Sequence, residues 1–121
     1  MAHIIDIPAF KDKRGELHVI QRELPFQVKR VYYIHGVPNV VRGGHRHKNT
    51  DQLLICLHGS CTVSCDDGSG FESFVLDDSG KGLYVDRDDW HTMQGFSDGA
   101  VLLVLANTPY DVNDYIDEPY A

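Results

Sequence analysis

The residues best suited to chemistry in this sequence are His45 and His47, which are separated by a single residue in the segment Val41–Lys48. Side chains at positions i and i+2 of an extended chain point the same way, so both imidazoles should enter one space. Two converging imidazoles suit either metal binding or proton transfer. Gly43 and Gly44 just before them allow the backbone to approach a ligand closely. The plainer alternative is a polar loop with incidental histidines, since the chain has seven.

The spacing extends beyond this pair. His45 and His47 are followed by Gln52 and then by a glycine, an order similar to the first cupin motif, in which Gln52 replaces the usual glutamate. His91 stands where a second cupin motif would supply a further histidine, although the usual Pro and Gly before it are absent. The resemblance implies a jelly-roll barrel in which these four side chains face one cavity. Because an amide is a poorer ligand than a carboxylate for a divalent ion, Gln52 favours proton transfer over metal binding.

A closer resemblance covers nearly the whole chain. It rests on motifs that follow one another in the family order: Arg14-Gly15, Arg30-Val31-Tyr32-Tyr33-Ile34, Arg42 to Lys48, Leu57 to Cys61, Gly82 to Val85, Trp90-His91-x-Met93 and Asp114-Tyr115-Ile116. In these motifs the chain resembles the cupin sugar 3,4-ketoisomerases that act on dTDP-4-keto-6-deoxyglucose. Gly44 and Arg46 depart from the aromatic residue and the alanine usual in that family, which leaves the substrate and the product configuration at carbon 4 open.

The resemblance implies that a ketone moves from carbon 4 to carbon 3 of a dTDP-linked sugar through an enediol. Nothing is oxidised overall, so no redox cofactor is required, and Gln52 in place of a carboxylate predicts that no metal is needed. A histidine can take and return the protons that this reaction moves. By resemblance, His45 is the first candidate for the base, with His47 and Tyr32 as its partners. Arg42 and Arg30 are candidates for the diphosphate, because a guanidinium binds phosphate bidentately. The other expected substrate-binding residues are Arg14, Gln52, His91 and Trp90.

Plainer roles stay open for several of these residues. Surface ion pairs would equally explain Arg30 and Arg42, and packing in the core would explain Tyr32 and Trp90.

Other functions are also compatible with the pattern. A metal-dependent cupin oxygenase would use the three histidines as ligands, and Gln52 argues against it. A non-catalytic cupin would bind a sugar without turning it over, and a sugar 3,5-epimerase would share the same barrel. The order of the motifs favours the ketoisomerase.

The elements that must position these residues are short strands. Apolar runs broken by Gly, Asp, Asn or Pro are typical of a β-sandwich or barrel, and no segment keeps a helical period over three turns. We therefore expect one all-β domain over residues 1–121, with a helical turn or a strap after Thr108. The predicted strands are His3–Ile7, Glu16–Gln21, Val28–His35, Gln52–Leu57, Cys61–Cys65, Phe71–Leu76, Gly82–Val85, Thr92–Phe96 and Val101–Ala106.

Composition narrows the class of partner. The net charge of −7 and the lack of a Lys/Arg-rich run argue against nucleic acid and against an anionic membrane. No apolar stretch approaches the ~20 residues of a membrane span, and the first residues lack a signal-peptide pattern. The three cysteines lack metal-type spacing, so we expect reduced thiols in a cytoplasmic protein.

Two predicted strands are apolar at every position, Leu53–Leu57 and Val101–Leu105. A half-exposed strand would alternate between apolar and polar residues, so both faces of these strands should be covered. The sequence therefore predicts a homodimer, which the family resemblance also implies.

Overall fold

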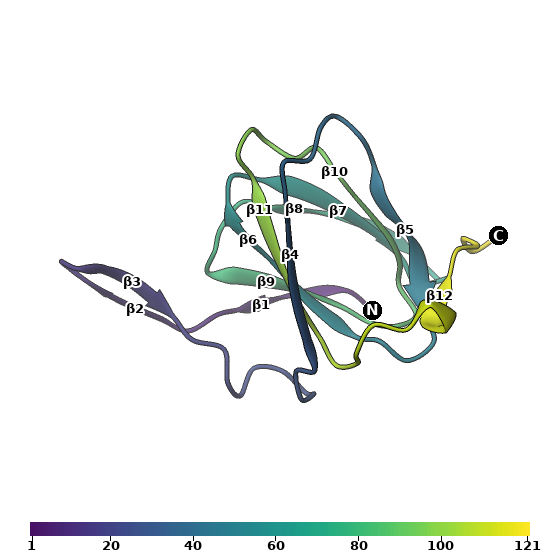
Figure 1. Cartoon of the computed structure of the whole chain (residues 1–121), viewed down its shortest axis with the longest axis horizontal. Coiled ribbons are helices and arrows are strands. Elements are labelled where there is room, and N and C mark those ends of the chain that lie inside the picture. Colours follow the sequence, from purple (N-terminus) through teal and green to yellow (C-terminus); the bar gives the residue numbers. More distant parts are fainter.

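Two five-stranded antiparallel sheets face each other in the computed structural model, which describes residues 1–121 (Figure 1). The first sheet contains, in spatial order, β1 (His3–Asp6), β9 (Lys81–Val85), β6 (Gln52–His58), β11 (Val101–Ala106) and β4 (Arg30–His35). The second contains β12 (Tyr115–Ile116), β5 (Arg42–His47), β10 (Trp90–Gln94), β7 (Cys61–Asp66) and β8 (Phe71–Leu76). The predicted all-β fold is confirmed.

Two smaller features lie outside these sheets. Strands β2 (Ala9–Asp12) and β3 (Gly15–His18) form a hairpin of their own, which projects from the body of the molecule in Figure 1. A short 3₁₀ helix, Val112–Asp114, precedes β12 and belongs to the strap expected after Thr108. No helix in the structure is long and apolar enough to cross a membrane.

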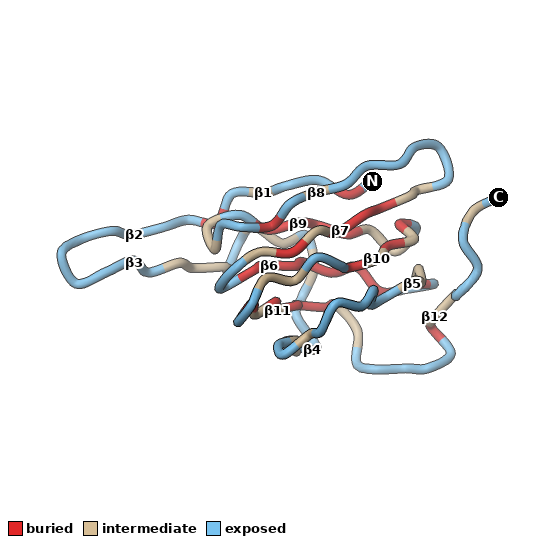
Figure 2. The backbone as a smooth tube through the Cα atoms, turned by 90° about the horizontal axis from the view of Figure 1, so that it is seen from above, coloured by how far each residue is buried: buried red, intermediate tan, exposed pale blue.

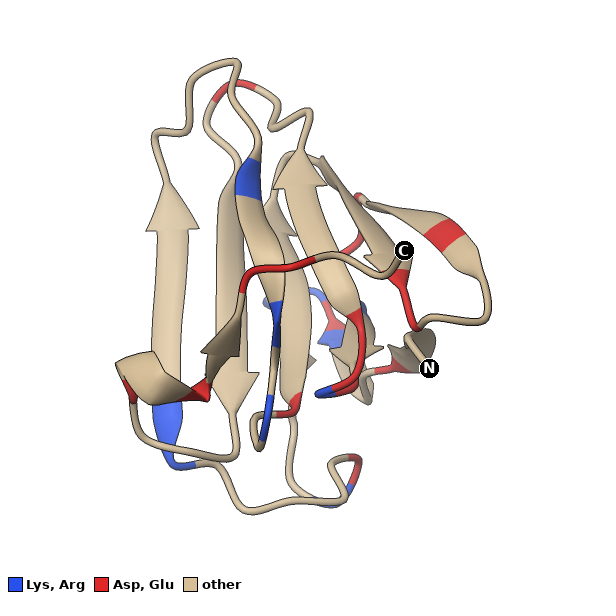
Figure 3. Ribbon diagram, turned by 90° about the vertical axis from the view of Figure 1, so that its right-hand side faces the viewer, with Lys and Arg blue, Asp and Glu red and all other residues tan.

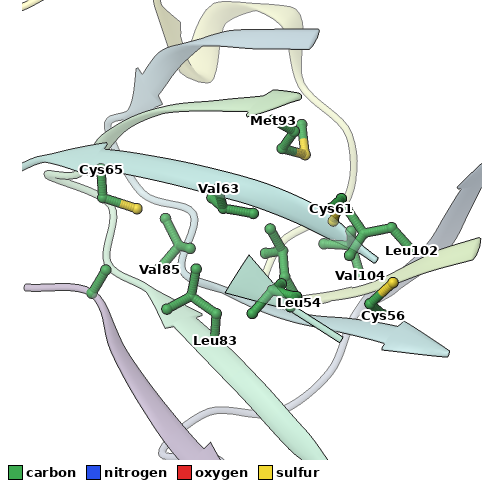
Figure 4. Packing of buried hydrophobic residues seen from close by; sticks show 12 residues of the cluster. Leu54, Cys56, Cys61, Val63, Cys65, Leu83, Val85, Met93, Leu102 and Val104 are labelled. Atoms are coloured by element: carbon green, nitrogen blue, oxygen red, sulfur yellow. The ribbon is translucent and has the colours of Figure 1, made fainter. Parts of the chain in front are cut away.

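The core lies between the sheets, where alternate residues of each strand point inward. Figure 2 shows the buried positions along the central strands, and Figure 4 shows how their side chains meet. The three cysteines are free and pack here as small hydrophobic residues, and burial raises the pKa of Cys61 and Cys65 to about 12. The main cluster includes Leu54, Cys56, Cys61, Val63, Cys65, Leu83, Val85, Met93, Leu102 and Val104.

A second apolar cluster covers the outer face of the first sheet. It consists of Leu53 and Ile55 from β6, Leu105 from β11 and Ile7, with partly buried residues that include Ile20 and Leu24 packed against it. The segment between β3 and β4, which carries the last two, therefore covers much of β6 and β11 within one chain. A second subunit is not needed to explain why these strands are apolar on both faces.

Candidate active site

Strands β5 and β10 bring three histidines together at one end of the sandwich. His45 and His47 point inward from β5, and His91 points inward from β10, where it lies directly opposite His45. The ring centroids are 5.1 Å apart for His45 and His47, 5.2 Å for His45 and His91, and 6.2 Å for His47 and His91. Seven of the nine predicted site residues lie in or next to this cluster.

Two glycines set the register of the histidines. His91 pairs with His45, but the next residue, Thr92, pairs with Gly43, so Gly44 is the extra residue of a β-bulge. Gly43 and Gly44 have φ angles of +82° and +81°, a region that only glycine adopts freely. A Cβ atom on Gly43 would also lie 3.0 Å from the carbonyl oxygen of His91. The glycine pair is therefore required by the backbone that places His45.

Burial keeps these imidazoles neutral at pH 7. Desolvation, assisted by the neighbouring His47, lowers the pKa of His45 to about 4. Desolvation, assisted by His45, lowers the pKa of His91 to about 3, and its Nδ1 donates to the carbonyl oxygen of Asp89 at 3.2 Å. Desolvation also lowers the pKa of His47, against a hydrogen bond and charge from Asp114 that raise it. The cluster is thus a set of neutral groups that can accept protons.

A cavity of about 330 Å³ opens beside the cluster. Its size is within the range of small-molecule sites. Strands β4 and β5 supply most of its wall, and two tyrosines of the C-terminal strap complete it. The lining residues are Arg30, Tyr32, Ile34, Arg42, Gly43, His45, Met93, Tyr110 and Tyr115.

Gln52 holds the hydroxyl group of Tyr32 at this wall. The buried side-chain amide of Gln52 donates to the Tyr32 oxygen at 2.9 Å. Burial raises the pKa of Tyr32, so the phenol keeps its proton at neutral pH. Because the oxygen accepts from Gln52, the O–H of Tyr32 is left to donate into the cavity. Across the chain, no three His, Cys, Asp or Glu side chains are arranged to share one metal ion.

Arg30 and Arg42 are two cations at the cavity that have no carboxylate partner. Neither guanidinium is in an ion pair with a carboxylate, so the alternative of surface ion pairs does not apply in this chain. The Arg30 guanidinium lies 5.4 Å from the ring centroid of Tyr32 and 5.8 Å from that of Tyr110, and its Nε is buried without a partner. Figure 3 shows this side of the molecule, with basic positions on the strands and acidic positions along the C-terminal tail.

Two predicted site residues lie elsewhere in the chain. Trp90 precedes His91 on β10 and therefore points to the opposite face of the sheet. There its indole N–H donates to the carbonyl oxygen of Asp117 at 3.2 Å. Arg14 lies at the tip of the projecting hairpin, where its guanidinium binds the carboxylate of Asp12. Neither side chain lines the cavity of its own chain.

The strap supplies three residues that were not among the predicted site residues. Tyr110 and Tyr115 line the cavity, and the ring of Tyr115 lies 4.7 Å from the rings of both His45 and His47. Asp114 lies next to Tyr115 and binds His47. The motif Asp114-Tyr115-Ile116 is the sequence signal for two of them, and Tyr110 has none, because the strap itself has no apolar periodicity.

Comparisons with known proteins identify the family of this chain. The model of the FdtA family, described as WxcM-like, C-terminal, matches residues 1–121. The TDP-4-oxo-6-deoxy-alpha-D-glucose-3,4-oxoisomerase of Aneurinibacillus thermoaerophilus is 43% identical over 116 residues, which cover 93% of this chain and 84% of that protein.

Solved structures give the same result. QdtA, a sugar 3,4-ketoisomerase from Thermoanaerobacterium thermosaccharolyticum in complex with TDP, has a TM-score of 0.93 at 39% identity, over 97% of this chain and 88% of that one. WlaRB, a TDP-quinovose 3,4-ketoisomerase from Campylobacter jejuni, has a TM-score of 0.93 at 42% identity, over 97% and 92%. Because the family model, the sequence relative and these structures all match nearly the full chain, the protein belongs to the FdtA family.

Proposed function

We propose that the protein is a sugar 3,4-ketoisomerase, which converts a dTDP-linked 4-keto-6-deoxyhexose to its 3-keto isomer. One observation carries this conclusion: His45, which belongs to a cluster of neutral histidines, and a protonated tyrosine share a cavity with two unpaired arginines. These are the groups that a proton-transfer reaction on a sugar diphosphate needs. The relatives named above are 3,4-ketoisomerases or a 3,4-oxoisomerase, which supports the same reaction.

The isomerisation moves protons and no other groups. A histidine of the cluster takes the proton from carbon 3, and the electrons of that bond form a double bond between carbons 3 and 4. The O–H of Tyr32, which faces the cavity, is our candidate for stabilising the charge that develops on the oxygen of carbon 4. The proton is then returned to carbon 4, and the hydroxyl proton on the oxygen of carbon 3 is passed to the oxygen of carbon 4, so that a ketone forms at carbon 3 and a hydroxyl at carbon 4. Substrate and product are isomers, so no oxidant is consumed.

The same cavity has groups for the rest of the substrate. Arg30 and Arg42 are the candidates for the diphosphate, because two guanidinium groups without carboxylate partners can bind it bidentately. Tyr110 is exposed beside Arg30 and offers an aromatic surface at the rim.

The direct test is incubation with dTDP-4-keto-6-deoxyglucose, followed by NMR of the sugar. The proposal expects the ketone signal to move from carbon 4 to carbon 3, and the same spectrum will give the configuration at carbon 4. A variant with both Arg30→Gln and Arg42→Gln should retain the histidine cluster but require a much higher substrate concentration. A substrate that stays unchanged with folded wild-type protein, at concentrations that saturate binding, would refute the function.

We also propose that the protein is a homodimer, now on different grounds. The hairpin of β2 and β3 makes no sheet with the rest of its chain and is exposed along almost its whole length (Figure 2). Phe10 and Leu17 face each other across it, although both are more than 60% exposed. An isolated two-stranded hairpin is marginally stable in water. A second copy of the chain that packs against it would account for both features.

The outer face of β4 offers a matching surface. Val31 and Tyr33 point outward from this edge strand and are exposed, beyond the region that Ile20 and Leu24 cover. Apolar surface of this kind on an edge strand is commonly covered by a partner. The cytoplasmic location expected from the sequence stays a prediction, which cell fractionation would check.

A further inference from the structure

The last residues of the strap, 117–121, lie on the outer face of the second sheet, on the side opposite the histidines. Arg46 alternates with the histidines of β5, and Trp90 precedes His91 on β10, so both side chains point to that outer face. Figure 3 shows this tail crossing the strands of the sheet. The same two strands therefore hold the histidines on one face and the tail on the other.

Contacts at two points hold the tail in place. The guanidinium of Arg46 lies 4.3 Å from the ring centroid of Tyr120, and its Nη1 donates to the Tyr120 hydroxyl oxygen at 3.2 Å. The same hydroxyl donates to the carbonyl oxygen of Asp88 at 2.8 Å. At the start of the tail, the indole N–H of Trp90 donates to the carbonyl oxygen of Asp117 at 3.2 Å. We call these contacts the outer clasp.

The tail follows directly after β12, the strand that brings Tyr115 to the site. β12 pairs with β5 over two residues, Tyr115 with His47 and Ile116 with Arg46. A strand of two residues frays unless the residues around it are tied down. Before β12, the carboxylate of Asp114 is bound by the turn between β5 and β6. After β12, the outer clasp has the same role.

Tyr115 covers the ring of His45. The two ring centroids are 4.7 Å apart, and both side chains line the cavity. Desolvation is the largest influence on the pKa of His45 and lowers it, whereas the charge of Asp117 acts in the opposite direction. The groups that face His45 are His47 and Arg42 from β5, His91 from β10, Arg30 and Tyr32 from β4, and Tyr115 and Asp117 from the strap. Water admitted by a displaced Tyr115 would therefore raise the pKa of His45 toward its ordinary value.

We propose that Arg46 and Trp90 are positioning residues for the isomerisation: through the tail they hold Tyr115 over His45 and keep water from the base at the cavity. This rests on the proposed function. Neither side chain lines the cavity, so both act through the strap and not on the sugar. Trp90 thus has a role that differs from the substrate binding expected from the sequence.

The test is the double variant Arg46→Ala and Trp90→Phe, which removes the cation beside Tyr120 and the N–H that binds Asp117. Alanine is usual at position 46 in the family, and phenylalanine keeps an aromatic ring at position 90, so the strands should still form. We expect hydrogen exchange at Tyr115 and Ile116 to become faster. Proton NMR titration, with His45 assigned by a His45→Asn variant, should give a pKa for His45 above the wild-type value of about 4.

The pH dependence of turnover is a second readout. A pKa of about 6.5 would leave about a tenth of the His45 rings neutral at pH 5.5. We therefore expect kcat/KM of the double variant to fall by up to about tenfold at pH 5.5 and to change little at pH 8. A merely structural defect would lower kcat/KM to the same extent at both pH values, and that result would overturn the proposal.

The matched control is Gln94→Ala. Gln94 is exposed on the same face of β10 as Trp90, and none of the hydrogen bonds that hold the tail involves it. This variant should keep the wild-type pKa of His45 and the wild-type pH profile. A shift equal to that of the double variant would indicate that any change on this face disturbs His45, contrary to the proposal.

The exchange rates separate the two steps of the argument. Unchanged exchange at Tyr115 in the double variant would show that the outer clasp does not hold β12, and faster exchange with an unchanged pKa of His45 would show that Tyr115 does not shield it. Either result refutes the proposal. If the double variant does not fold, Tyr120→Phe decides in its place, because it removes both hydrogen bonds of the Tyr120 hydroxyl and leaves the strands intact. If wild-type protein isomerises no 4-keto sugar, the proposed function fails, whereas the titration and the exchange rates still test the clasp.

Discussion

At the scale of single residues, burial and not charge pairing sets the chemistry of His45. An imidazole that is protonated at neutral pH could not act as a base. Desolvation lowers the pKa of His45 to about 4 and therefore keeps its ring unprotonated under ordinary conditions. A base with so low a pKa is a weak one.

The acid side of the pH profile should reflect this. A histidine with a lowered pKa loses its function only when the pH falls through that lowered value. We expect kcat/KM to stay level well below pH 6.5 and to decline as the pH approaches 4. Circular dichroism at each pH would show whether the fold persists. A decline centred near pH 6.5 in folded protein would indicate a histidine that is solvated, contrary to the structure.

Replacement of Tyr32 by phenylalanine should test the proton donor. Tyr32→Phe keeps the ring beneath Arg30 and removes the hydroxyl that Gln52 holds. General acid catalysis typically contributes ~10²–10⁴-fold, so we expect kcat to fall within that range while KM changes little. The neighbouring Tyr33 points outward from β4 and is exposed. Tyr33→Phe is therefore the control, and equal losses in both variants would contradict the role of Tyr32.

We expect turnover to survive removal of metal ions. The amide of Gln52 is already committed to Tyr32 and is a poor substitute for a carboxylate ligand. Protein treated with a strong chelator and then dialysed should retain its wild-type kcat, and elemental analysis should find less than one ion per chain. A stoichiometric ion whose removal abolishes turnover, and whose return restores it, would favour a metal-dependent reaction.

At the scale of elements, the bulge in β5 aligns the active site. Gly43→Ala introduces a side chain at a φ of +82°, with its Cβ 3.0 Å from a backbone oxygen. A left-handed conformation costs a non-glycine residue about 1–2 kcal/mol. We expect a lower urea midpoint and a lower kcat, because β5 must shift relative to His91. Gly70→Ala is the control, because its Cβ would meet nothing and its φ is not positive.

Sequence patterns predicted the apolar strands and missed the polar ones. β6, β7, β8 and β11 were expected almost as they occur, because their apolar runs end at clear turn residues. β5 was not among the predicted strands, because Arg42–His47 has no apolar alternation and is a strand only through its pairing with β10. β10 begins at Trp90, two residues before the predicted start.

Local sequence patterns also predicted only part of the candidate site. The histidines, Tyr32 and the two arginines gather because they alternate correctly on their own strands. Trp90 and His91 are adjacent, so alternation alone already implies that they face opposite ways. The partnership of Asp114 with His47 joins residues 67 positions apart, and no local pattern reveals a contact of that range.

At the scale of the whole molecule, the projecting hairpin should determine the oligomeric state. Replacement of both Phe10 and Leu17 by serine removes the apolar pair that faces solvent in the single chain. We expect sedimentation to change from a dimer to a 13.6 kDa monomer at micromolar concentration. Phe71 is a similarly exposed aromatic residue on β8, in the second five-stranded sheet, and the variant Phe71→Ser should stay dimeric. Wild-type protein that sediments as a monomer would refute the dimer.

The strap also bears on the order in which the protein folds. The strands that make the main core end at Ala106, whereas β12 and Asp114 reach the site only from the last part of the chain. During synthesis the barrel can therefore close around its core before His47 meets its carboxylate. A nascent chain would become stable first and acquire an aligned catalytic cluster last, when its C-terminal residues leave the ribosome.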